Sequence, residues 1–137
     1  MVMHMIKLSV GSDSPATLDE WQRSARLTEM EGQEASWHIT RQMPRQRDEI
    51  LNGGSIYWVI KGEIRCRQPV LGLDPIQDEE GTKYCKITLG RPLVLTVPVP
   101  RRPFQGWRYL KPGDEPPDLD GNGDSEMAAE LRALGLL

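Results

Sequence analysis

Residues 56–68 have the sequence IYWVIKGEIRCRQ, which predicts two β-strands joined by a bend at Lys61-Gly62. The first five residues are apolar throughout, as expected for a strand that is buried on both faces. Side chains alternate between the two faces of a strand, so the second strand places Arg65 and Arg67 on one face. Its other face carries three residues: Ile64, Cys66 and Gln68. The central part of the chain is therefore predicted to be β structure.

Two helices are predicted before this centre. Ser14 followed by Pro15 has the pattern of an N-cap and a first-turn proline, so a helix should begin there. We expect it to end near Gly32 and to lie on a sheet with one apolar face, formed by Leu18, Trp21 and Ala25. A short second helix is expected over 45–51, because the glycines at 53–54 supply a left-handed stop.

Four more strands are predicted from apolar or alternating segments: 5–10, 37–43, 83–89 and 93–97. The central strand that starts at Glu63 should run to Leu71. The acidic loop 74–81 then turns the chain into the strand at 83–89, and a hairpin is the expected connection.

The composition describes one globular domain. The chain has 137 residues, of which 38% are hydrophobic, and no window is long and apolar enough for a membrane span. The N-terminal residues lack the features of a secretory signal, so we expect a cytoplasmic protein with no membrane partner. In a reducing compartment Cys66 and Cys85 would both remain thiols.

The domain prediction divides the chain into three parts. Residues 1–112 should form the single domain, and residues 113–124, which are rich in Asp, Gly and Pro, should form an acidic flexible linker. Residues 125–137 are predicted to be a short C-terminal helix, a candidate docking segment for a protein partner. Positions 118–124 match the first half of a calcium loop, but the second half lacks the bidentate glutamate, which favours a solvated tail.

Residues 98–112 have the sequence PVPRRPFQGWRYLKP, which combines four cations with three of the chain's eight aromatic residues. Prolines fix φ and remove backbone donors, so this segment should be extended or rich in turns. Arginines and aromatic rings on an extended support can bind phosphates and stack on bases. The same side chains can also clamp a loop onto its own domain, with Phe104 and Trp107 plugging an open end of the fold.

Positive and negative charges are distributed unevenly along the chain. The net charge is −3, yet residues 41–111 contain thirteen Lys and Arg against seven Asp and Glu, so the rest of the chain is acidic. A basic middle with acidic flanks is what a nucleic-acid-binding core would show, although alternating solvated cations would give the same count.

The chain contains no motif that names a reaction. His4, His38 and the two cysteines do not form the close pairs of structural metal sites. No glycine-rich phosphate loop or nucleophile elbow occurs. Glu63, flanked by Lys61 and Arg65, should stay ionised and be structural or ligand-orienting. We therefore predict no catalytic residue, no metal and no cofactor, and we favour binding over catalysis.

The order of a helix, a glycine turn and a strand bearing Lys, Glu and Arg, with the residues of segment 57–68, resembles the pseudobarrel domains of the PUA-like group, including its ASCH and EVE branches. The chain more closely resembles a small bacterial family of unknown function, over nearly its whole length up to about Lys111. This resemblance is carried by the tetrapeptide at 65–68, by Cys85 and by the segment 101–110. The PUA-like resemblance implies an α+β fold with a mixed, barrel-like sheet of about five or six strands, flanked by two or three helices. It also implies that basic and aromatic residues hold RNA or a modified base.

These observations predict an RNA- or modified-nucleotide-binding module. Eleven residues are its predicted ligand contacts: Trp58, Lys61, Glu63, Arg65, Arg67, Arg101, Arg102, Phe104, Trp107, Arg108 and Tyr109. The alternative is a small enzyme or small-molecule-binding domain whose pocket is lined by Trp58, Arg65 and Trp107, with Glu63 as acid or base. A third hypothesis is an assembly partner that docks through the C-terminal helix.

Overall fold

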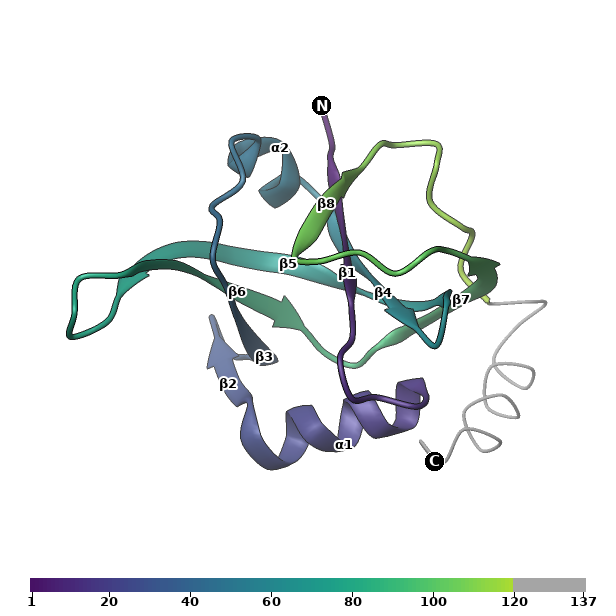
Figure 1. The fold of residues 1–137 in the computed structure, drawn as a ribbon, viewed down its shortest axis with the longest axis horizontal. Helices are drawn as coiled ribbons and strands as arrows, with labels where there is room; N and C mark the ends of the chain where they lie inside the picture. The colour runs from purple at the N-terminus through teal and green to yellow at the C-terminus, as the bar shows by residue number, and fades with distance from the viewer. Residues whose placement is uncertain (120–137) are drawn as a thin grey trace.

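The structure, a computed structural model, describes residues 1–119 (Figure 1). These residues form two helices and eight strands: β1 (His4–Leu8), α1 (Pro15–Ala25), β2 (Leu27–Met30), β3 (Gln33–Thr40), α2 (Arg47–Leu51), β4 (Ser55–Ile60), β5 (Glu63–Gln77), β6 (Lys83–Gly90), β7 (Val94–Pro100) and β8 (Trp107–Leu110). The predicted α+β class is confirmed. Within the described residues no helix is long and apolar enough to cross a membrane.

All eight strands belong to one curved sheet with the order β2-β3-β6-β5-β4-β1-β8, and β7 pairs with β5 off this path. β1 and β4 are parallel and the other pairs are antiparallel, so the sheet is mixed, as predicted. The prediction of a barrel-like sheet with five or six strands is wrong. The sheet has eight strands and is open, because β2 and β8 end it without pairing to each other.

The predicted centre of the chain is the hairpin of β4 and β5. Lys61 and Gly62 form a two-residue turn with φ of 49° and 81°, and positive φ at both positions is the geometry of a type I′ hairpin turn. A β-bulge then shifts the register, because Trp58 pairs with Cys66 and Val59 with Ile64, leaving Arg65 unmatched. The prediction that Ile64 and Cys66 share a face is therefore wrong, and they belong to different hydrophobic clusters.

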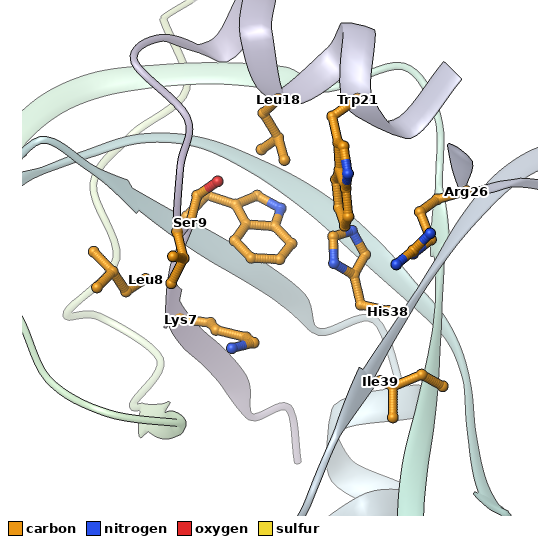
Figure 2. Close-up of a pocket in the computed structure, with 10 residues that line it drawn as sticks. Lys7, Leu8, Ser9, Leu18, Trp21, Arg26, His38 and Ile39 are labelled. Carbon is orange, nitrogen blue, oxygen red and sulfur yellow. The ribbon is translucent and has the colours of Figure 1, made fainter. Parts of the chain in front are cut away.

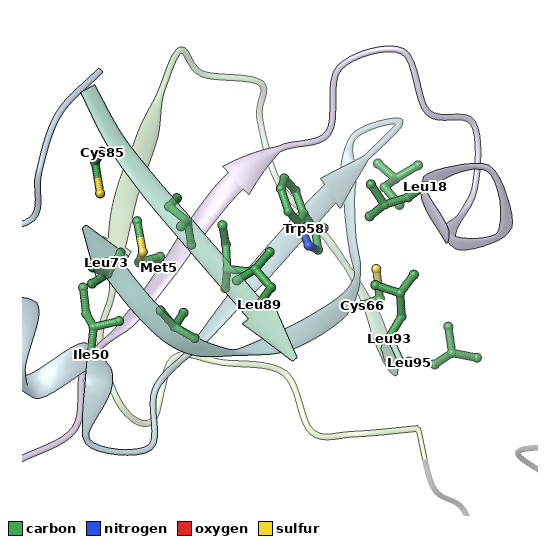
Figure 3. Close-up of a cluster of buried hydrophobic side chains, with 14 residues drawn as sticks. Met5, Leu18, Ile50, Trp58, Cys66, Leu73, Cys85, Leu89, Leu93 and Leu95 are labelled. Carbon is green, nitrogen blue, oxygen red and sulfur yellow. The ribbon is translucent and has the colours of Figure 1, made fainter. Parts of the chain in front are cut away.

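The main core fills the concave side of the sheet (Figure 3). Its fourteen buried residues are Met5, Leu18, Ile50, Ile56, Trp58, Ile60, Cys66, Val70, Leu73, Cys85, Ile87, Leu89, Leu93 and Leu95. Leu18 from α1 and Ile50 from α2 lie at opposite ends of this cluster. A second, smaller cluster covers the other face of β1 and β4, where Phe104 packs against it.

Helix α1 begins as predicted and ends earlier. The Ser14 hydroxyl accepts a hydrogen bond from the Thr17 backbone N–H at 3.2 Å, and the Thr17 hydroxyl accepts one from the Ser14 N–H at 3.0 Å, which completes a capping box. The expected end near Gly32 is wrong, because the chain leaves the helix at Arg26 and forms the β2–β3 hairpin. That hairpin turns at Glu31 and Gly32, which both have positive φ.

The buried face of α1 is partly polar, contrary to the apolar face predicted. Trp21 and Ala25 are exposed, whereas Leu18, Asp19 and Gln22 are buried. The polar side chains are satisfied by buried partners, so the helix docks through hydrogen bonds as well as apolar contact.

Strand boundaries also differ from the predicted ones. β3 covers Gln33–Thr40 instead of 37–43, β5 runs on to Gln77, and β7 continues through two prolines to Pro100. The β5–β6 hairpin is confirmed, with its turn at residues 78–82. β7 tolerates Pro98 and Pro100 because within residues 1–119 it pairs with one strand, β5, and the bridge on its other side lies at Thr96, before both prolines.

Two aromatic residues of β8 connect the edge of the sheet to the segment that follows β3. The Trp107 indole N–H donates to the Gln42 carbonyl at 2.9 Å, and the Tyr109 hydroxyl accepts from the Gln46 backbone N–H at 3.1 Å. These contacts hold the two sides of the open sheet together at one end, where strand pairing does not.

The described part of the predicted linker lies against the domain. The Pro117 carbonyl accepts from the Val97 N–H, and Leu119 N–H donates to the Leu95 carbonyl. Arg67 binds the Asp118 carboxylate through two nitrogens at 2.7 Å each. The division of the chain at residue 112 stays a prediction. The predicted helix at 125–137 and most of the calcium-like loop lie outside the described residues.

A buried hydrogen-bond network attaches α1 to the sheet through Gln68. Its amide oxygen accepts from the Trp58 indole N–H at 3.0 Å and from Gln22 Nε2 at 2.8 Å. Its amide nitrogen donates to Gln22 Oε1 at 3.2 Å and to the Gly90 carbonyl at 3.1 Å. Arg91 donates to Gln22 Oε1 at 2.8 Å and also pairs with the buried Asp19. Every one of these polar groups therefore has a partner.

We expect Gln68→Leu to lower the free energy of unfolding by about 3 kcal/mol or more, because a side chain of similar size would leave several buried donors and acceptors unsatisfied at about 1–3 kcal/mol each. Urea unfolding followed by circular dichroism measures the loss. Gln77→Leu on the exposed end of the same strand is the matched control and should change stability by less than about 1 kcal/mol. Equal losses in the two variants would contradict the role of the network.

Candidate functional site

A cleft of about 290 Å³ opens between β1 and β3 at the side of α1 (Figure 2). Ten residues line it: Lys7, Leu8, Ser9, Val10, Leu18, Trp21, Arg26, His38, Ile39 and Trp58. They come from the end of β1 and its following loop, from α1 and its C-cap, from β3 and from β4. The cleft lies where the curved sheet does not close.

The strand register explains why these side chains meet. Lys7 lies beside Trp58 in the parallel β1–β4 pair. Each comes two residues after a core residue of its own strand, Met5 or Ile56, so both side chains lie on the core face of the sheet. On β3, His38 is buried together with Ser36 and Thr40, whereas the intervening Ile39 is exposed. Figure 2 shows Trp21 extending from α1 towards the His38 ring, with Lys7 on the opposite wall.

Three aromatic rings form a row from the floor of the cleft to its mouth. The centroids of Trp58 and His38 are 4.8 Å apart, and those of His38 and Trp21 are 5.2 Å apart. Trp58 is 1% exposed and Trp21 is 41% exposed, so the row runs from the core to solvent. A flat ligand that enters the cleft meets aromatic surface along this path.

Arg26 places a guanidinium beside this row. Its Cζ lies 4.7 Å from the ring centroid of Trp21 and 4.4 Å from that of Trp37. Cation–π contacts of this kind hold the guanidinium in place and leave its charge available to an anion. Arg26 is also the C-cap of α1, so the end of the helix fixes its backbone.

His38 is neutral in the folded protein. Burial, assisted by the positive charges of Lys7 and Arg26, lowers its pKa from 6.5 to about 3. Because Gln22 Oε1 accepts from Arg91, the Gln22 amide nitrogen faces His38 and donates to its Nε2 at 3.2 Å. From this network we assign the His38 proton to Nδ1, which makes that nitrogen a donor.

Lys7 supplies a second cation to the cleft. Burial lowers the pKa of its ammonium group below the usual value, and no carboxylate lies within 4 Å of it among residues 1–119. The residues that line the cleft include two cations, Lys7 and Arg26, and no Asp or Glu. Its chemistry therefore suits a flat ligand that carries negative charge or hydrogen-bond acceptors.

The structure brings only one of the predicted ligand contacts, Trp58, into this cleft. Trp107, Arg108 and Tyr109 line a separate depression of about 300 Å³. The two tryptophans of the predicted enzyme pocket thus line different cavities, and Arg65 lines neither of them.

Several predicted contacts serve the fold. Arg67 binds Asp118 and donates to the Ser55 hydroxyl at 3.0 Å, and its hydrogen bonds lower the pKa of the Asp118 carboxyl. Phe104 packs on the second hydrophobic cluster. Arg108 lies over the Phe104 ring with its Cζ 5.4 Å from the centroid.

The remaining predicted contacts lie around the β4–β5 turn. Lys61 is exposed at the turn itself, and Glu63 is half-buried at the start of β5. Arg101 and Arg102 are exposed and line a shallow depression together with Gly62 and two prolines.

Five polar or aromatic residues of the cleft were missed from the sequence: Lys7, Ser9, Trp21, Arg26 and His38. Trp21 was predicted to face the core because it shares a helical stripe with Leu18. In the structure the core-facing side of α1 includes Asp19 and Gln22, so the helix is rotated relative to its apolar stripe, and the sequence pattern contained no sign of this rotation. Nothing local to β3 indicated that His38 lies opposite Lys7.

The cysteines do not contribute reactive groups to this site. Cys66 and Cys85 are buried, and burial raises the pKa of the first thiol to about 12 and of the second to about 11. Both are therefore protonated and poorly nucleophilic at neutral pH. In the part of the chain that the structure describes, no three His, Cys, Asp or Glu side chains group as metal ligands.

Comparison with known proteins gives one match. The model of a family described as a protein of unknown function, DUF1489, covers residues 5–137, and the chain belongs to this family. The resemblance to a family of unknown function is thus confirmed, and it extends beyond the expected limit near residue 111. No curated protein and no solved structure matches the chain, and none of these comparisons supports the PUA-like resemblance.

His38 predicts a pH dependence of stability. A pKa of about 3 in the folded state and 6.5 in the unfolded state means that the unfolded chain binds more protons between these values. Stability should therefore fall as the pH drops below about 6.5.

We expect the loss to reach on the order of 3 kcal/mol by pH 4 relative to His38→Gln, which keeps an acceptor for Gln22 but does not titrate. Urea unfolding of both proteins from pH 4 to 7 measures the difference and subtracts the carboxylates common to both. A pH-independent difference would show that His38 is not buried in its neutral form.

Proposed function

Since the DUF1489 family to which the chain belongs is described without an activity, we propose from the geometry of the cleft that this protein binds a nucleotide, free or within RNA. The observation that carries the proposal is the combination of Lys7 and Arg26 with the aromatic row in a cleft that contains no carboxylate. Bases stack on aromatic side chains, and guanidinium and ammonium groups bind phosphate oxygens.

The donors of the cleft match the acceptors of a base. Besides the two cations, the cleft offers the Nδ1–H of a neutral His38 and the hydroxyl of Ser9. Base edges present ring nitrogens and carbonyl oxygens, and hydrogen bonds to them distinguish one base from another. His38 is held by Gln22, so its donor has a fixed direction, which favours specificity over adaptable contact.

The size of the cleft favours one nucleotide unit. Small-molecule sites have volumes of about 300–1,000 Å³, and the 290 Å³ measured here lies at the lower limit of that range. In this arrangement the base lies against the exposed ring of Trp21, and the negatively charged group lies near Arg26 and Lys7. We do not propose an enzymatic role, because the lining of the cleft contains no Asp, Glu or Cys, and within the described residues no hydrogen bond pairs the Ser9 hydroxyl or the Lys7 amine with a base.

We expect the protein to bind nucleoside monophosphates, and Trp21→Ala to weaken binding about tenfold or more, because stacking of one base contributes about 1–3 kcal/mol. Isothermal titration calorimetry with the four common ribonucleotides and their nucleosides measures this. Lys7→Gln should reduce affinity for monophosphates more than for nucleosides, since it removes a charge.

The matched control is Tyr84→Ala, which removes a half-buried ring outside the cleft. Like Trp21, Tyr84 lies beside an arginine, because the Cζ of Arg41 is 5.3 Å from its ring centroid. It should bind as the wild type does. The proposal fails if no nucleotide binds, or if Trp21→Ala and Tyr84→Ala have the same affinity.

A further inference from the structure

We infer that the ligand is a single-stranded nucleic acid whose phosphates, next to the base in the cleft, contact a cationic corner formed by Lys61, Arg101 and Arg102. The inference rests on the proposed function, since the strand is positioned by the base that the cleft holds. It adds a second binding surface to the cleft. It also specifies the ligand class as a polynucleotide instead of a mononucleotide.

The cationic corner adjoins the wall of the cleft through β4. Ser9, on that wall, donates its backbone N–H to the Val59 carbonyl at 2.9 Å. Gly62, three residues further along the chain, accepts from the Arg101 N–H at 2.7 Å. Three residues span at most about 11 Å, so with the two hydrogen bonds the Arg101 nitrogen lies within roughly 16 Å of the Ser9 nitrogen.

A second contact joins the same two regions. Lys61 Nζ lies 3.6 Å from an Asp13 carboxylate oxygen in the loop that leads from the cleft wall to α1. The segment that carries Arg101 crosses the sheet next to this turn, where Phe104 anchors it on the second hydrophobic cluster (Figure 1). The cationic corner therefore lies at the end of β4 beside the loop that forms one wall of the cleft, and the segment beyond the arginines crosses the opposite face of the sheet.

The positive charges of Arg101 and Arg102 are available to a ligand. Both are exposed, and in residues 1–119 neither has a carboxylate within 4 Å. They flank a depression of about 370 Å³ whose other lining residues, two prolines and Gly62, carry no charge. The carboxylates of this corner are Asp13, which pairs with Lys61, and the half-buried Glu63.

Proline orders the backbone that carries the two arginines in advance of binding. Pro100 and Pro103 fix φ on either side of the arginine pair, and the Arg101 N–H is already bound to the turn. Arginine binds phosphate through two parallel hydrogen bonds, and a support that is ordered before binding loses less entropy when the ligand arrives. Two adjacent guanidiniums therefore suit successive phosphates of one strand.

The test compares a mononucleotide with single-stranded RNA and DNA of about eight nucleotides, a length within the range of about 4–16 nucleotides for single-strand sites. Fluorescence anisotropy at several salt concentrations gives affinity and salt slope. We expect the oligonucleotides to bind more tightly than the mononucleotide and with a steeper slope. Tighter binding of RNA than of DNA would identify RNA as the ligand.

The variant Arg101→Ala with Arg102→Ala should weaken oligonucleotide binding and reduce the salt slope by about 1.4, or about 0.7 per lost phosphate contact. Mononucleotide affinity should not change. Lys83→Ala with Lys86→Ala on β6 removes the same charge elsewhere and is the matched control. Because Arg101 and Arg102 are exposed, thermal unfolding should show that the variant keeps its fold.

The outcomes separate this inference from the proposed function. If the mononucleotide binds but oligonucleotides gain nothing, or if the two double variants behave alike, the inference is overturned and the proposed function stands. If Trp21→Ala leaves oligonucleotide affinity unchanged, the strand does not use the cleft, and the inference is overturned as well. If neither ligand binds, both proposals fail together.

Discussion

The mutual hydrogen bonding of two buried amides, Gln22 on α1 and Gln68 on β5, is the constraint on which the geometry of the cleft depends. The pair fixes the rotation of the helix, because Gln22 can reach Gln68 only if the polar stripe of α1 faces the sheet. That rotation turns Trp21 away from the core and towards the mouth of the cleft. The same amides hold the indole of Trp58 and the imidazole of His38.

The network also determines the charge of the cleft. The Gln22 amide N–H donates to the His38 Nε2, which is compatible with the neutral ring that burial favours. The guanidinium of Arg91, which is nearly fully buried, is neutralised by Asp19 and Glu34 on the far side of the amides. Asp19 and Glu34 are thus engaged with Arg91, and Lys7 and Arg26 face the cleft without a carboxylate in its lining.

Local patterns predicted local structure well, and they did not predict pairing over long distances. The strands around Lys61-Gly62 and the N-cap at Ser14 follow from neighbouring residues, and both were found where expected. The open sheet and the position of His38 opposite Lys7 depend on curvature accumulated over several strands, which no short pattern records. Arg67 was predicted to face a ligand, but its partner Asp118 lies 51 residues away, in a segment whose composition indicated a linker.

The aromatic residues show why the sequence and the structure favour different candidate surfaces. Trp107 and Tyr109 were predicted to stack on a ligand, yet their polar atoms are bound to the segment after β3, and they fasten the open end of the sheet. Trp21 is the most exposed of the tryptophans that line the cleft, and within the described residues its indole N–H has no bound partner. An aromatic side chain whose polar atom is already bound is engaged in the fold, whereas one that keeps both a ring face and a donor accessible can serve a ligand. By this criterion the row that ends at Trp21, with its exposed ring and an indole N–H that no described residue binds, is the surface that the proposed function assigns to a base.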